Sequence, residues 1–151
     1  MGIQENLQGQ GPAEFPIQTI GWVRSPLKSL DQCPHQGHEG APEAWIEIEP
    51  KYSGALDGLK KGGEILVLSW MHLADRSRLR VHPRGNRENP LMGVFATRAP
   101  HRPNPIGLHK TRILAIETPS RILVESLELL DQTPVVDIKP VLGNRRHKKR
   151  N

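Results

Sequence analysis

Short apolar runs separated by turn residues occupy most of the chain, and this pattern predicts strands rather than helices. The run EILVLSWMH at 64–72 is nearly continuous and indicates a central strand, whereas AWIEIEP at 44–50 alternates apolar and acidic residues like a half-buried strand. Residues 52–63 have at most a short helical pattern, because their glycines interrupt it. The predicted strands cover residues 15–25, 44–50, 64–72, 91–98, 110–117, 121–130 and 133–141.

This run of strands favours an all-β barrel or sandwich over the α/β folds of most nucleotide-binding enzymes. No segment predicts a long helix, so the alternation of strands and helices expected of a βαβ fold is missing. The Gly-x-Gly pair at Gly9 and Gly11 has Glu14 where a phosphate-binding loop needs its last glycine, and no strand precedes it. The sequence therefore argues against a Rossmann-type nucleotide site.

The 151 residues fit one domain, flanked by segments of different composition. Residues 1–14 are polar and rich in Gly and Gln, so we expect a flexible leader, then a globular domain at 15–142 and a basic tail at 143–151. The formal charge of +5 favours an anionic partner, and RRHKKR at 145–150 is typical of a solvated or nucleic-acid-binding arm. Aromatic residues, at 4%, are too few for the base-stacking platform of common single-strand RNA binders.

The cysteine content and the apolar runs bear on the compartment. Cys33 is the single cysteine, which excludes an intrachain disulfide and is typical of a reducing compartment. No apolar run is long enough to span a membrane, and no signal-peptide pattern follows Met1. We therefore expect a cytoplasmic protein that does not associate with membranes.

Three residues with metal-binding side chains, Cys33, His35 and His38, lie close together in the segment CPHQGHEGAPEA at 33–44. A closed structural zinc site needs four ligands, usually as two separated pairs, and the chain has no second pair that contains a cysteine. We therefore expect no metal. The segment is either a polar surface loop or a ligand-binding loop, since Gly37 and Gly40 permit close approach of the backbone.

The stretch TRAPHRPNPIGLH at 97–109 combines prolines with polar donors. Each proline fixes its own φ and restrains the preceding residue, so this stretch is expected to be stiff and extended. It could be a plain surface turn, a proline-rich docking segment, or a binding wall that presents Arg98, Arg102 and Asn104 as fixed donors. The residues alone leave these alternatives open.

The segment after the predicted central strand carries further polar candidates. His72, at the end of that strand, could act as a base or a ligand donor, or simply be satisfied within the structure. A patch that faces phosphate groups could also form nearby. Its members would be Lys60, Lys61, Arg76, Arg78, Arg80 and Arg84.

The strings IGWVRSP (20–26), GVFATRAPHRPNPIGL (93–108) and LLDQTPVVDIKP (129–140) give the chain a family resemblance. The residues of these motifs and their order along the chain resemble the TrmO (YaeB-like) family of tRNA methyltransferases. The match runs from about residue 17 to 142, and the chain looks like the shorter members of the family. Three positions depart from the family pattern: His109 stands where a small residue is more typical, Gln132 replaces a turn glycine, and Val141 replaces an aromatic residue.

This resemblance implies a single-sheeted β-barrel with short helical turns that binds S-adenosylmethionine, works as a homodimer and lacks the Rossmann methyltransferase fold. The implied reaction is methylation of N6 of threonylcarbamoyladenosine, the nucleoside immediately 3′ of the tRNA anticodon. The resemblance places the cofactor contacts at Gln36, Gly37, His38, Met71, His72, Arg98, Leu108, Glu125, Ser126, Leu127 and Glu128.

Under this hypothesis a base must remove or polarise the N6 proton, because the lone pair of this urea-like nitrogen is delocalised. His72, Asp131 and Asp137 are candidate bases, which we leave unranked, and Asn104 is a further candidate catalytic residue. Asp137 could instead form only a salt bridge with Lys139. The residues expected to contact tRNA are Arg102, Arg145, Arg146, Lys148 and Lys149.

Two other functions stay open at this point. One keeps S-adenosylmethionine but transfers the methyl group to another RNA or to a small molecule. The other is a basic RNA-binding module without catalysis, which would bind RNA with a steep salt dependence and no cofactor.

Overall fold

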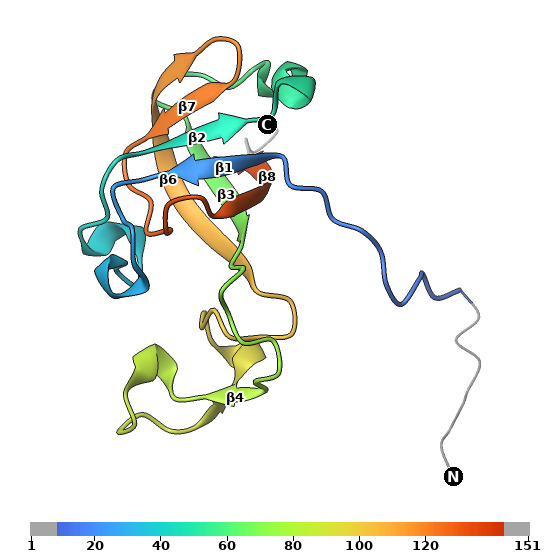
Figure 1. The fold of residues 1–151 in the computed structure, drawn as a ribbon, viewed down its shortest axis with the longest axis vertical. Coiled ribbons are helices and arrows are strands. Elements are labelled where there is room, and N and C mark those ends of the chain that lie inside the picture. The colour runs from blue at the N-terminus through green and yellow to red at the C-terminus, as the bar shows by residue number, and fades with distance from the viewer. Residues whose placement is uncertain (1–8, 144–151) are drawn as a thin grey trace, which may run out of the picture.

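A computed structural model describes residues 9–143, and its main body is a closed β-barrel (Figure 1). The strands follow one another around the barrel in the order β1-β2-β7-β6-β3-β8, and every neighbouring pair is antiparallel. The predicted all-β fold is therefore confirmed, and the barrel alternative is the correct one. The strands are β1 (Gly21–Arg24), β2 (Ala44–Ile48), β3 (Glu64–Trp70), β6 (Ile106–Glu117), β7 (Arg121–Val124) and β8 (Pro134–Pro140).

The helical segments of residues 9–143 are all short 3-10 turns, as the glycine- and proline-rich connections predict. They are η1 (Leu30–Gln32), η2 (Gly37–Glu39), η3 (Pro50–Leu56), η4 (Pro83–Gly85) and η5 (Val94–Ala96). In the same part of the chain no helix has the length and apolar content needed to cross a membrane.

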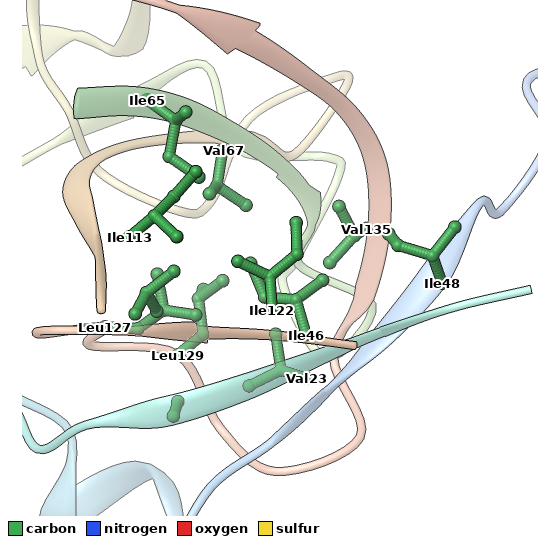
Figure 2. Close-up of a cluster of buried hydrophobic side chains, with 12 residues drawn as sticks. Val23, Ile46, Ile48, Ile65, Val67, Ile113, Ile122, Leu127, Leu129 and Val135 are labelled. Atoms are coloured by element: carbon green, nitrogen blue, oxygen red, sulfur yellow. The ribbon is translucent and has the colours of Figure 1, made fainter. Parts of the chain in front are cut away.

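Alternate residues of the strands point into the barrel and build its apolar core (Figure 2). In β3, Ile65 and Val67 point inward, and Ile113 of β6 faces them with 1% of its surface exposed. Each such buried side chain stabilises the fold by about 1.5–3 kcal/mol relative to an exposed position. The same alternation also buries polar side chains of these two strands, namely Ser69 of β3 and His109 and Thr111 of β6.

The segment after β7 leaves the sheet, so the strand predicted at 121–130 is correct only up to Val124. The amide of Leu127 donates to the carbonyl of Pro42, and that of Asp131 donates to the carbonyl of Leu27. Leu127 and Leu129 are buried in the core cluster, at 0% and 4% exposure. Tertiary burial of these two leucines thus overrides the local strand propensity.

Residues 71–105 project from the barrel between β3 and β6, and we call them the projecting lobe (Figure 1). Their only ladder is the short pair of β4 (Arg80–Val81) with β5 (Met92–Gly93). The strand predicted at 91–98 is therefore wrong beyond Gly93. The guanidinium of Arg102 donates to the carbonyls of Val94, Thr97 and Ala99, which holds this stretch in a turn instead.

The proposed chain ends are only partly described. Residues 9–20 carry no strand or helix, so the strand predicted at 15–25 is wrong before Gly21, and the expected leader at 1–14 stays a prediction. Residues 1–8 lie outside the described residues, and so do the predicted RNA contacts Arg145, Arg146, Lys148 and Lys149.

Gly21 allows β1 and β2 to approach closely, which gives a test of the barrel. A Cβ there would lie 2.2 Å from the carbonyl oxygen of Glu47, an atom of the backbone that cannot move aside. We expect Gly21→Ala to lower the free energy of unfolding by about 2–3 kcal/mol, measured by urea denaturation. Gly54→Ala is the matched control, because a Cβ at Gly54 would meet nothing within 4 Å. Equal unfolding midpoints for the two variants would contradict this strand contact.

Candidate functional site

A cavity of about 280 Å³ gathers most of the residues predicted to contact the cofactor. A larger hollow of about 490 Å³, lined by Arg24, Lys28, Trp45 and Asp131 among others, includes one predicted residue only. We take the smaller cavity as the candidate site because more of the predicted residues line it. Its predicted lining residues are Gln36, Gly37, His38, Glu125, Ser126 and Glu128.

The loop that carries Gly37 approaches the opposite wall of the cavity closely. A Cβ on Gly37 would lie 3.1 Å from Oε2 of Glu128 and 3.3 Å from Oγ of Ser126. Gly40 ends the η2 turn at φ 93°, in the left-handed region that favours glycine. Arg84 of the projecting lobe donates to Glu39 at 2.7 Å and so ties this loop to the lobe. Gly37 is thus closely approached by the protein's own side chains, while the approach of a ligand to Gly37 and Gly40 stays a prediction.

The cations of the cavity are already neutralised by a carboxylate at its rim. Lys110 and Arg112 lie 3.1 Å and 3.4 Å from Glu64, and Arg112 also lies 3.9 Å from Glu125. The hydrogen bond from Lys110 is the largest cause that lowers the pKa of Glu64 below its ordinary value. This rim therefore presents both charge signs, while Glu128 lies deeper, with only 9% of its side chain exposed.

A series of three buried polar side chains runs from the barrel interior to this cavity. A hydrogen bond of 2.8 Å joins Oγ of Ser69 to Nε2 of His109, and Nδ1 of His109 is hydrogen-bonded to Oε1 of Glu128. Ser69 is fully buried and the His109 side chain is 3% exposed. Gly107 leaves room for the pair, since a Cβ there would lie 2.4 Å from both Oγ of Ser69 and Nε2 of His109.

Sequence reasoning did not find Ser69 or the role of His109. The signal was present in the alternation of β6, where Gly107, His109 and Thr111 occupy the inward positions that Ile113 also occupies. A histidine in such a position must find polar partners inside the barrel.

The series also connects the cavity to the second group of predicted residues. Met71 and His72 follow Ser69 at the end of β3, and the amide of Met71 donates to the carbonyl of Pro105. Leu108 lies on the outer face of β6, 42% exposed, and is paired in register with Leu68. His72 is exposed. Buried Ser69, His109 and Glu128 therefore link the end of β3 to the cavity, but Met71, His72 and Leu108 do not line it.

The stiff proline stretch is fastened to the end of β3 by Arg76. Its Nε donates to the carbonyl of Pro103 at 2.7 Å, and its Nη2 donates to Oδ1 of Asn104 at 3.2 Å. The same guanidinium lies 5.1 Å from the ring centroid of Trp70, close enough for a cation–π contact. The stretch is thus held against the end of β3, and its role as the wall of a binding site stays a prediction.

Two of the predicted arginines differ in their surroundings. Arg98 is exposed on the projecting lobe, and within the described residues it makes no ion pair or side-chain hydrogen bond. The guanidinium of Arg102 instead donates hydrogen bonds to the three backbone carbonyls of the turn. Its RNA contact stays a prediction, and the contacts of the structure give it a role in shaping the lobe.

Asp131 and Asp137 both have cationic partners. Asp131 accepts from the amide of Ser25 at 2.9 Å and lies 2.9 Å from Lys28; burial alone would raise its pKa, but these two partners hold the pKa below its ordinary value. Asp137 lies 3.0 Å from Lys139, so the salt bridge considered for this pair is formed. Whether either carboxylate acts as a base stays a prediction.

The loop residues considered as zinc ligands are not gathered together. Within residues 9–143 no group of three or more His, Cys, Asp or Glu side chains is arranged to hold a metal ion. The thiol of Cys33 lies 3.6 Å from the carbonyl of Ser29, and burial, followed by the charges of Asp31 and Glu128, raises its pKa.

Comparisons with known proteins agree with one another. The family model of the tRNA-methyltransferase O N-terminal domain matches residues 22–144. A probable S-adenosyl-L-methionine-binding protein of Methanothermobacter thermautotrophicus is 47% identical over 127 residues, which are 84% of this chain and 90% of the relative. An S-adenosyl-L-methionine-binding protein of Archaeoglobus fulgidus is 42% identical over 123 residues, covering 82% of this chain and 86% of the relative.

A solved structure, the crystal structure of TrmO from Pseudomonas aeruginosa, has a similar fold. It superposes with a TM-score of 0.69 and 32% sequence identity over 93% of this chain. The chain spans 62% of the length of that solved protein.

The depressed pKa of Asp131 predicts how stability depends on pH. The folded-state pKa lies below the unfolded value of about 3.9, so the ionised carboxylate stabilises the fold above that value and loses its effect as the pH falls through the folded pKa. We expect Asp131→Asn to cost about 1–2 kcal/mol at pH 7 and progressively less toward pH 3, measured by urea denaturation. Asp57→Asn, at an exposed turn position, is the control and should change stability by less than about 0.5 kcal/mol. A cost of Asp131→Asn that is the same at both pH values would contradict this assignment.

Proposed function

The chain belongs to the tRNA-methyltransferase O family, and on that premise we propose that it is an S-adenosylmethionine-dependent methyltransferase. Its proposed substrate is tRNA, and the proposed reaction is methylation of N6 of threonylcarbamoyladenosine beside the anticodon. The observation that carries the proposal is the cavity walled by Gly37 and Glu128, which joins the end of β3 through buried side chains.

The residues of the cavity fit the cofactor chemically. S-adenosylmethionine is a cation at sulfur and a zwitterion at its amino-acid end, and it needs acceptors for its ribose hydroxyls. The rim carboxylates Glu64 and Glu125 are partners for the amino group of that amino-acid end. Glu128 supplies a carboxylate away from water. The glycine at position 37 leaves space that a Cβ would fill.

When bound, S-adenosylmethionine supplies an electrophilic methyl group. Transfer of that group forms a carbon–nitrogen bond at N6, breaks the carbon–sulfur bond, and requires N6 to lose its proton. The chain's task is to align the acceptor with the methyl group and to take up that proton. The wall at Asn104, fastened by Arg76, is rigid enough to serve the alignment.

Among the three candidate bases we favour His72. Its side chain is exposed at the end of β3, next to Met71, which packs against the core. Asp131 and Asp137 are each paired with a lysine, which weakens a carboxylate as a base. Asp131 also lines the larger hollow rather than the cofactor cavity.

The projecting lobe is the proposed tRNA-binding surface. Residues 71–105 contain seven arginines against only Asp75 and Glu88, and such a surplus attracts phosphate groups. The lobe also exposes apolar side chains that suit contact with a second copy, in keeping with the homodimer that we propose; they are Leu73, Leu79, Leu91 and Phe95. The proposed location is the cytoplasm, which the single cysteine also favours.

The proposed reaction is tested by methyl transfer to two preparations of the same tRNA. Purified protein is incubated with S-adenosylmethionine that carries a labelled methyl group and with tRNA that either carries or lacks the threonylcarbamoyl group. The tRNA is then digested, and its nucleosides are separated and identified by mass spectrometry. We expect labelled N6-methyl-threonylcarbamoyladenosine from the first tRNA only. Cofactor binding without methylation of either tRNA would contradict the substrate and favour another acceptor. RNA binding without any cofactor binding would favour the module without catalysis.

Arg98 gives a separate test of the cofactor site. Because its guanidinium is exposed and makes no ion pair within the described residues, it is available to a ligand carboxylate through two parallel hydrogen bonds. We expect Arg98→Ala to weaken S-adenosylmethionine binding at least roughly tenfold, measured by isothermal titration calorimetry. Arg87→Ala removes another exposed arginine of the same lobe and should stay within about twofold of the unmodified protein. Unchanged affinity in Arg98→Ala would remove this residue from the site.

A further inference from the structure

The buried series of Ser69, His109 and Glu128 has the chemical make-up of a nucleophile with its base and acid, but its surroundings exclude that role. Ser69 is fully buried and lines neither the cavity nor the larger hollow. No substrate could therefore reach its hydroxyl. The end of the series that meets a cavity is the carboxylate of Glu128.

The two oxygens of Glu128 have different environments. Oε1 is hydrogen-bonded to Nδ1 of His109, whose other nitrogen is fixed by Ser69. Oε2 faces the Gly37 loop, 3.1 Å from where a Cβ of Gly37 would lie, and it accepts no hydrogen bond from the described residues. One oxygen is thus held, while the other is left for a ligand in a place that is more than nine-tenths buried.

We propose that His109, fixed by Ser69, is a positioning residue that holds Glu128 so that its second oxygen faces the sulfonium of S-adenosylmethionine. This inference rests on the proposed function and extends it to a residue outside the predicted site. A buried carboxylate is costly unless it is paired. His109 occupies Oε1 alone, and the nearby cations Lys110 and Arg112 are paired with Glu64 and Glu125, which leaves Oε2 for a cationic ligand.

The sulfonium suits this place better than the amino group of the cofactor. An ammonium carries three N–H donors and is strongly hydrated, so the rim with its exposed charges of both signs fits it. A sulfonium has no donor to satisfy and loses little on leaving water, so a single carboxylate in a dry position is sufficient. The neutral thioether left after methyl transfer lacks this attraction, and the site therefore favours substrate over product.

The test compares the affinities of S-adenosylmethionine and S-adenosylhomocysteine, measured by isothermal titration calorimetry on the full chain. The two ligands differ only in the methyl group and its positive charge, so their affinity ratio isolates the attraction to Glu128. We expect Glu128→Gln to weaken S-adenosylmethionine roughly tenfold while S-adenosylhomocysteine changes less than about twofold. A merely structural role would lower both affinities equally and would overturn the proposal.

His109 is tested by graded variants. His109→Leu should lower the ratio of the affinity for S-adenosylmethionine to that for S-adenosylhomocysteine, as Glu128→Gln does. In His109→Asn the amide can replace Nδ1 as a donor to Glu128, so this ratio should stay within about threefold of that of the unmodified protein. Ser69→Ala is a milder change that keeps the His109–Glu128 contact, and we expect a loss of about twofold to threefold in the ratio. It keeps the test decisive if His109→Leu does not fold. A ratio unchanged in all three variants would overturn the role of His109.

Ile113→Val is the matched control, because it lies in the same strand and is equally buried but has no polar contact. It should lower stability by about 0.5–1.5 kcal/mol and leave the affinity ratio unchanged. A ratio that falls in this control as well would show a general effect of weakened packing and overturn the proposal. If the unmodified protein binds neither ligand, the proposed function itself fails, and that result is distinct from equal losses in the variants.

Discussion

A carboxylate that is almost fully buried must be paired, and the region around the cavity is arranged to meet this requirement at Glu128. His109 can reach Glu128 only because Gly107 leaves space on the same strand. The loop that carries Gly37 can lie this close to Glu128 only because Gly37, like Gly107, has no side chain. The chain after β7 leaves the sheet, and with Leu127 and Leu129 in the core this brings Glu128 to the cavity.

The projecting lobe depends on a different kind of contact. It has a two-residue ladder and little apolar core of its own, so arginine side chains that bind backbone carbonyls replace most of the sheet. Arg76 and Arg102 serve in this way, whereas other arginines of the lobe stay exposed. The cavity with Glu128 and the arginine-rich surface of the lobe thus lie on separate parts of one small protein, which keeps the proposed cofactor site apart from the proposed RNA surface.

The sequence predicts the barrel strands well where the pattern is clear: the alternation of apolar and acidic residues predicts β2, and the nearly continuous apolar run predicts β3. It fails at 91–98 and beyond Val124, where long-range contacts decide the local structure: Arg102 collects the carbonyls of one segment, and core burial bends the other. Gln132 stands where the family pattern has a turn glycine, and it keeps a φ of 66°, a conformation that glycine adopts more easily.

For the candidate site, the resemblance supplied six residues of the cavity wall, which lie at the η2 turn and in the segment after β7. The resemblance could not supply the contacts among Ser69, His109 and Glu128, which are far apart in the sequence. The register of β3 with β6 brings Ser69 to His109, and the segment after β7 brings Glu128 to His109. Register depends on the sum of many strand contacts, not on any short motif.

The claim on which this account depends is that one cofactor molecule occupies the region from the Gly37 loop to the end of β3. Amide chemical-shift mapping by NMR, with S-adenosylmethionine added to the isotope-labelled full chain, tests it directly. The account predicts that the amides of Gly37, Glu128, Met71 and His72 shift together along a single binding curve. Shifts gathered instead around Lys28 and Trp45, at the larger hollow, would contradict it.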